Sequence, residues 1–96
     1  MRLIQSPRAS ADLDNIYTYG ASNHGVEAAL VYLEDIERRF RLMLDHPRSG
    51  RAEDTIMTGL RSMPSGSHRI YYRVAGDTIL IDRILHMAAD AKQWLG

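Results

Sequence analysis

Residues 26–45 constrain the fold most, because they carry an unbroken apolar face at helical spacing. Pro47 predicts that this helix ends near residues 45–46, which gives about 21 residues and a rod on the order of 30 Å long. Three acid–base pairs spaced four residues apart predict a solvent-exposed outer side: Glu34/Arg38, Asp35/Arg39 and Glu37/Arg41. The apolar positions recur at steps of three and four: Val26, Ala29, Leu30, Leu33, Ile36, Phe40, Met43 and Leu44.

The segment before this helix predicts a second helix, joined to the first by a tight corner. Ser6 followed by Pro7 is typical of a helix start, and Gly25 allows the positive φ that a corner requires. The short apolar segment 2–5 is expected to be a strand that leads directly into the helix. The inward stripe of this first helix is Ala9, Leu13, Ile16, Tyr17 and Gly20, with Asp12, Asn15 and Thr18 on the opposite, polar side. Together the two helices form an antiparallel hairpin.

Three apolar runs in the second half of the chain predict strands. Residues 60–63, 68–74 and 78–85 are separated by turn residues at 64–67 and 75–77. Connections this short force antiparallel neighbours. Two further segments follow from the pattern: residues 48–58 are expected to be a loop, with a short strand at its end as an open alternative, and residues 88–95 a short helix. The fold class is therefore α+β, with an N-terminal strand and a helical hairpin packed on an antiparallel sheet, in one domain over residues 1–96.

Period-two alternation assigns the strand residues to two faces. In the middle strand Ile70, Tyr72 and Val74 are expected to face the helices. The opposite set is Arg69, Tyr71 and Arg73. In the last strand the two sets are Leu80, Asp82, Ile84 and Ile79, Ile81, Arg83, Leu85. Neither set is cleanly polar, so both faces of the sheet should be covered, the second either by the C-terminal segment with Trp94 and Leu95 or by a partner chain.

The composition argues against several classes of protein: disulfide-bonded, metal-binding, membrane-spanning and strongly nucleic-acid-binding. Cysteine is absent, and the histidines at 24, 46, 68 and 86 are scattered, so we expect no disulfide, no metal and no cofactor. No apolar stretch approaches the roughly 20 residues that cross a bilayer, and no signal peptide is evident, so the expected location is the cytoplasm. The formal net charge is zero, which argues against strong direct binding of nucleic acid.

The chain resembles the ParE toxins of type II toxin-antitoxin systems, within the RelE/ParE superfamily. The resemblance spans nearly the whole chain and lies in four segments in a fixed order. These are "ADLDNIYTYGASNHG" from residue 11, "AALVYLEDIERRFRLMLDHPRSG" from residue 28, "GLRSMPSGSHRIYYRV" from residue 59 and "ILIDRILHMAAD" from residue 79. The family fold that this implies is the one that periodicity predicts.

The resemblance implies a non-enzymatic toxin that binds DNA gyrase and blocks its turnover. It also implies neutralisation by a ParD-like antitoxin of the ribbon-helix-helix type, in a hetero-oligomer that buries apolar surface on the sheet and the hairpin. The residues that we expect to face these partners are Arg69, Tyr71, Arg73, Arg83, His86 and Trp94.

Two other functions remain open at this point. RelE-type relatives cut mRNA on the ribosome, and here Arg69, Arg83 and His86 would be the catalytic set. That set lacks the usual lysines, and nothing in the sequence points Glu53 or Asp54 toward Arg69. A third possibility is a module that binds antitoxin but has lost toxicity.

Simpler roles compete with each candidate residue. Arg69 or Arg73 can pair across the sheet with Asp82 or lie over Tyr71. His86 can be a hydrogen-bonded residue at a strand end, and Trp94 can anchor the last helix.

Overall fold

The computed structural model describes residues 1–95, and its elements follow the predicted order. They are β1 (Arg2–Gln5), α1 (Pro7–His24), α2 (Val26–Asp45), β2 (Arg51–Ala52), β3 (Arg61–Ser65), β4 (His68–Ala75), β5 (Thr78–His86) and α3 (Ala91–Leu95). β2 lies near the start of the 48–58 segment, whereas the sequence suggests a strand at its end. The last helix is shorter than predicted, because residues 87–90 form a turn and bend.

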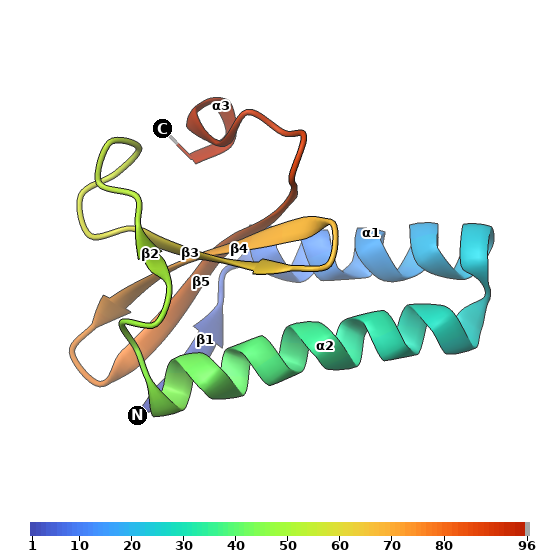
Figure 1. Ribbon diagram of the computed structural model, residues 1–96, viewed down its shortest axis with the longest axis horizontal. Coiled ribbons are helices and arrows are strands. Elements are labelled where there is room, and N and C mark those ends of the chain that lie inside the picture. Colours follow the sequence, from blue (N-terminus) through green and yellow to red (C-terminus); the bar gives the residue numbers. More distant parts are fainter. Residues whose placement is uncertain (96) are drawn as a thin grey trace.

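The hairpin of α1 and α2 forms where the sequence places it (Figure 1). The Ser6 hydroxyl accepts a hydrogen bond from the Ala9 amide at 2.9 Å, and Gly25 adopts a φ of 95° between the helices. The acid–base pairs predicted between positions i and i+4 on the outer side of α2 do not form for Asp35 and Arg39, which make other contacts. Asp35 pairs with Arg38, and Arg39 donates to the Pro64 carbonyl at 3.1 Å. The outer side of α2 is nevertheless exposed, as predicted.

The five strands form one sheet in the order β1-β5-β4-β3-β2. The predicted antiparallel meander of β3, β4 and β5 is confirmed, and β2 adds an antiparallel pair at one edge. At the other edge β1 pairs with β5 in parallel, from Arg2 opposite Thr78 to Gln5 opposite Ile81. Because β1 ends there, the second half of β5 has no neighbouring strand on that side among the described residues.

Both faces of the sheet are covered, as predicted. The hairpin lies on one face, and α3 with the loop before β3 lies on the other (Figure 1). The first core joins Ile36, Phe40 and Met43 of α2 to strand residues that include Ile70 and Tyr72. The second core contains Leu60, Tyr71 and Leu85, which are covered by Ile56, Met57, Ala89, Ala91 and Leu95. The C-terminal segment itself therefore covers the second face.

A β-bulge in β5 overturns the strict alternation predicted for that strand. Tyr71 lies opposite Arg83 but Tyr72 lies opposite Ile81, so Asp82 is an extra residue in β5. Beyond the bulge the facing reverses, and Ile84 joins Ile79 and Ile81 in the first core instead of facing away from them. The facing predicted for Ile70 and Tyr72 is confirmed, whereas Val74 is 39% exposed near the end of β4.

Tyr72 ties the end of α2 to the sheet and leaves no room for a side chain at Gly50. Its hydroxyl donates to the Pro47 carbonyl and accepts from the Gly50 amide, both at 2.8 Å. A Cβ at Gly50 would lie 2.6 Å from the Tyr72 hydroxyl oxygen and 2.8 Å from the Ser62 carbonyl oxygen. We expect Gly50→Ala to lower the free energy of unfolding by about 2–3 kcal/mol in urea titrations.

Gly20→Ala provides the control for this prediction. A Cβ at Gly20 would meet Ala29 at 3.3 Å, so a small adjustment accommodates it, and alanine favours the helix by up to about 1 kcal/mol. Equal unfolding midpoints for Gly50→Ala and the unmodified chain would contradict the steric argument.

Candidate functional site

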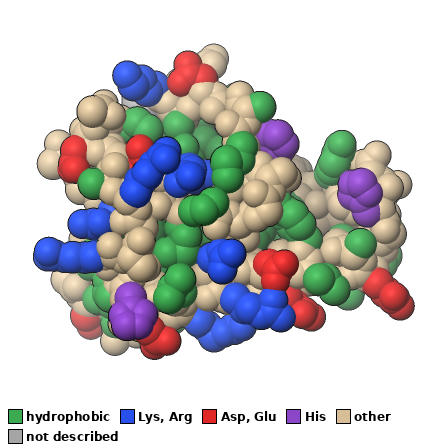
Figure 2. Space-filling model, in the orientation of Figure 1, with side chains coloured by type: hydrophobic (Ala, Val, Ile, Leu, Met, Phe, Trp, Pro, Cys, Tyr) green, Lys and Arg blue, Asp and Glu red, His purple; other side chains and the backbone are tan. Residues whose placement is uncertain are grey.

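A groove of about 790 Å³ opens where the hairpin runs past the end of the sheet, and we call it the hairpin groove. Figure 1 shows α1 and α2 projecting beyond the strands, and Figure 2 shows the surface hollowed between the body of the molecule and this projecting end. α1 contributes Ile16 and Tyr19 to the wall, and α2 contributes Ala28 and Ala29. Tyr19 is 68% exposed, because there is no sheet beneath it to cover its ring. The wall on the hairpin side is therefore largely apolar and open.

The opposite wall of the hairpin groove comes from the sheet and from α3. His68 lines it from β4, Ile84 and His86 line it from β5, and Trp94 of α3 lies at its margin. Trp94 is 49% exposed, whereas Leu95 beside it packs on the second core. Trp94 and Leu95 thus divide the roles that the sequence suggests: Leu95 anchors α3 and Trp94 lines the groove.

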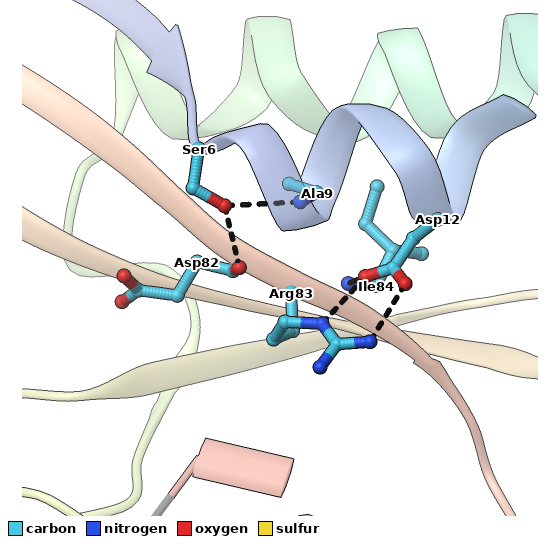
Figure 3. A network of polar contacts seen from close by, with 6 residues as sticks. All are labelled: Ser6, Ala9, Asp12, Asp82, Arg83 and Ile84. Atoms are coloured by element: carbon cyan, nitrogen blue, oxygen red, sulfur yellow. Dashed lines mark hydrogen bonds and ion pairs between the residues drawn. The ribbon is translucent and has the colours of Figure 1, made fainter.

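Asp12 fixes α1 to β5 beside the groove, at the point where β1 has ended (Figure 3). Its carboxylate accepts bonds from Arg83 Nε at 2.9 Å and Nη2 at 2.8 Å, and from the Ile84 amide at 2.9 Å. The Ser6 hydroxyl donates to the Asp82 carbonyl at 2.8 Å in the same network. These side chains satisfy backbone groups of β5 that a neighbouring strand would otherwise pair. Asp12 therefore faces β5, whereas the sequence predicts that it lies on the side of α1 opposite the apolar stripe.

Arg83 is enclosed by its partners. Its side chain is 13% exposed and that of Asp12 is 11% exposed, and the Arg83 guanidinium lies 5.4 Å from the centre of the Trp94 ring. Hydrogen bonding to Asp12 raises the pKa of Arg83. The guanidinium is thus charged, paired and stacked, and it contributes no unpaired positive charge to the groove.

A second polar cluster lies deeper in the groove and joins α2 to β4 and β5. The Tyr32 hydroxyl oxygen is 2.5 Å from His68 Nδ1, and it accepts a bond from the Ser67 amide at 2.9 Å. The His68 and His86 rings pack edge to face, with centroids 5.4 Å apart. Burial and the neighbouring His86 lower the pKa of His68, while Asp12 acts in the opposite direction.

A third polar cluster lies outside the groove. Arg69 Nη1 donates to the Ser62 hydroxyl at 2.8 Å, and that hydroxyl donates to Glu53 Oε2 at 2.5 Å. Arg51 Nε also contacts this carboxylate, at 3.2 Å. Glu53 therefore does lie beside Arg69, linked through a serine that is only 1% exposed. The pKa of the adjacent Tyr71 is raised, mainly by burial and in addition by the negative charge of Glu53.

The structure brings only part of the predicted site together. Arg83, His86 and Trp94 all line the hairpin groove. The other three predicted residues lie elsewhere: Arg69 in the Glu53 cluster, Tyr71 buried in the second core, and Arg73 in a two-bond pair with Asp82 at 2.8 Å.

Sequence reasoning missed Asp12, Tyr32 and His68 as groove residues, because each is positioned by partners far away in the chain. The simpler role suggested for Arg73, pairing with Asp82, is the one that the structure gives it.

Two further properties concern the whole described chain. Within residues 1–95, no group of three or more His, Cys, Asp or Glu side chains is placed to hold a metal ion. Over the same residues, no helix has both the length and the apolar character needed to cross a membrane.

Comparisons with known proteins agree with this fold and cover nearly the whole chain. The family model for the ParE toxin of the type II toxin-antitoxin system parDE matches residues 3–91. Toxin ParE1 of Caulobacter vibrioides is 38% identical over 91 residues, covering 95% of this chain and 94% of that protein. Toxin ParE1 of Mycobacterium tuberculosis is 38% identical over 90 residues, covering 93% of this chain and 92% of that protein.

A solved structure extends the likeness to three dimensions. A chain of the chromosomal ParDE toxin-antitoxin system of P. aeruginosa aligns with a TM-score of 0.77 at 28% identity, covering 90% of this chain and 95% of that one. Sequence and fold thus agree along the same residues. The protein belongs to the ParE toxin family of type II toxin-antitoxin systems.

Proposed function

We propose that this protein inhibits DNA gyrase without catalysing a reaction, and that a ParD-like antitoxin neutralises it by filling the hairpin groove. The observation that carries the proposal is the family match over residues 3–91, which spans every element that builds the groove except α3 beyond residue 91. Gyrase acts in the cytoplasm, so the proposal places the toxin there.

The groove has the properties of a site for an apolar peptide segment. Its lining is mostly apolar, and its charged members Asp12 and Arg83 neutralise each other. Exposed rings at its margin, Tyr19 and Trp94, have the amphipathic character typical of interface residues. A disordered antitoxin segment must bury extensive apolar surface to offset the entropy lost on ordering, and this groove provides such surface.

The six residues predicted to face partners divide between two surfaces under this proposal. Arg83, His86 and Trp94 belong to the antitoxin surface, because they line the groove. Arg69 and Arg73 lie outside it and belong to the gyrase surface. Tyr71 is 7% exposed beneath the segment that includes α3, so its contribution to a partner requires that this segment move.

Ribonuclease activity is the less favoured function, because the residues that it needs do not converge. On β4 and β5, Arg69 lies opposite Leu85, whereas His86 lies opposite His68, and successive strand residues point to opposite faces. Arg83 is held by Asp12 and cannot approach a phosphate without breaking two hydrogen bonds. A base, an acid and a free cation are therefore not assembled around one point in the described chain.

A supercoiling assay tests the proposal directly. Purified gyrase, relaxed plasmid and ATP are mixed with the toxin, with and without its ParD-like antitoxin. We expect loss of supercoiling and accumulation of cleaved plasmid, both reversed by the antitoxin. Arg69→Ala should weaken inhibition but leave antitoxin binding intact, because Arg69 lies outside the groove.

A parallel assay separates the alternatives. Active gyrase in the presence of excess toxin, together with codon-dependent cuts in ribosome-bound mRNA, would overturn the proposal in favour of the ribonuclease. Inactivity in both assays, with antitoxin binding retained, would identify a chain that has lost toxicity.

A further inference from the structure

Three of the four histidines of this chain line the hairpin groove: His24, His68 and His86. The fourth, His46, lies at the far end of α2. Of the groove histidines, His68 is the most constrained, because the Tyr32 ring and the His86 ring both meet it edge to face, at 5.5 Å and 5.4 Å. A segment that fills the groove must therefore come close to this imidazole pair.

The hydrogen bonds around Tyr32 fit a neutral His68 better than a charged one. The Tyr32 hydroxyl has a single proton, and it already accepts the Ser67 amide hydrogen. In the neutral tautomer that carries its proton on Nε2, Tyr32 donates this proton to His68 Nδ1 at 2.5 Å. A charged imidazole carries its own proton on Nδ1, so the tyrosine proton must turn away. The remaining acceptors are the Ser67 hydroxyl at 3.1 Å and the Ser65 carbonyl at 3.3 Å, both farther away than His68 Nδ1.

The charges that face His68 come from all the elements around it. Asp12 of α1 favours a charged imidazole, but this carboxylate is already bonded to Arg83. His86 of β5 acts in the opposite direction and disfavours the charged form of His68. With His68 neutral and the Asp12–Arg83 pair balanced, neither His68 nor this ion pair needs a counter-charge from a ligand.

We propose that the antitoxin segment presents an apolar side chain to the His68–His86 pair, and that binding requires a neutral His68 and so excludes its proton. This inference rests on the proposed function, because it describes how the same groove is controlled. Ile16 and Ala28, which line the same groove and are not buried, provide apolar surface for the same segment. The consequence is that toxin neutralisation depends on pH.

The direction of this dependence follows from desolvation. A bound apolar segment removes water from His68, so its pKa is lower in the complex than in the free toxin. Affinity is therefore full above the pKa of free His68 and is lost as the pH falls through that value. Because the pKa in the free toxin lies below the ordinary value of 6.5, the loss belongs to the mildly acidic range below it.

Calorimetric titration of the full-length toxin with its full-length ParD-like antitoxin tests the inference. We expect Kd to rise by between about twofold and about tenfold from about pH 7.5 to about pH 5.5, with proton release measured from the buffer dependence of the enthalpy. His68→Asn keeps an acceptor for the Tyr32 hydroxyl but cannot be protonated. It should reduce the ratio of the two Kd values to about one. His46→Asn, outside the groove, should preserve the full ratio.

Each outcome has a distinct meaning. Tighter binding at the lower pH would show that an acidic group faces the histidines and would overturn the inference, and so would a Kd that does not change with pH. An unchanged pH ratio in His68→Asn would also overturn it, because the proton would then belong to another group. Absence of binding at every pH would overturn the proposed function, and this inference with it.

Discussion

Asp12→Ala is expected to lower the free energy of unfolding by about 3–5 kcal/mol, because it leaves the Arg83 guanidinium enclosed and unpaired. The arginine side chain is only 13% exposed, so water replaces the lost carboxylate poorly. The same substitution removes the acceptor of the Ile84 amide, on the stretch of β5 that extends beyond its pairing with β1. Urea titration followed by circular dichroism provides the measurement.

Two variants control this prediction. Asp35→Ala breaks the Arg38 pair, whose side chains are 51% and 57% exposed, and it should cost less than about 1 kcal/mol. Adding Arg83→Met to Asp12→Ala should recover part of the loss, because the enclosed charge is removed. A cost for Asp12→Ala no larger than that for Asp35→Ala would mean that solvent reaches Arg83 freely.

Ala28→Arg is expected to weaken antitoxin binding by about 100-fold, the range of an interface hot spot. Ala28 is an exposed residue of α2 that lines the hairpin groove, so arginine at this position fills apolar space with a long charged side chain. Cells that express both proteins should then arrest, because the toxin is no longer neutralised. Calorimetry on the purified pair and growth curves provide the two readouts.

Ala11→Arg is the matched control for this variant. Ala11 is also an exposed helical alanine, but it lies on α1 and does not line the groove, so the same change in size and charge should leave binding within about twofold. Ala28→Arg toxin that still binds and is still neutralised like the Ala11→Arg variant would contradict the assignment of the groove to the antitoxin.

The architecture could be predicted from the sequence where local signals and packing agree. The apolar stripe of α2, the Ser6–Pro7 start of α1 and the turn residues between β3, β4 and β5 each have a short-range physical cause. β1 is recognisable as a strand, but its parallel place beside β5 depends on contacts that no local pattern reports. The bulge at Asp82 could not be predicted from the sequence either. β5 has apolar residues on both faces, so its pattern does not show where the side chains change from one face to the other.

The candidate site was predictable only in part, because several of its residues are placed by contacts between segments that are distant in sequence. Arg83, His86 and Trp94 lie close together in sequence near the end of the chain, and all three line the groove. Asp12 has the pattern of a solvated helix residue, and only the end of β1 brings its carboxylate to Arg83. No local pattern relates Glu53 to Arg69, because the serine that links them, Ser62, belongs to a third segment.

The pairing of β1 with β5 also sets the order of events during translation. The Ser6 hydroxyl bonds a carbonyl 76 positions further along the chain, and Asp12 bonds an arginine 71 positions further along. The hairpin is synthesised before its partner strand β5, and contacts of such sequence separation form late in folding. The hairpin groove therefore does not exist on most of the nascent chain. Any ligand that needs the complete groove can therefore recognise it only after β5 has been made.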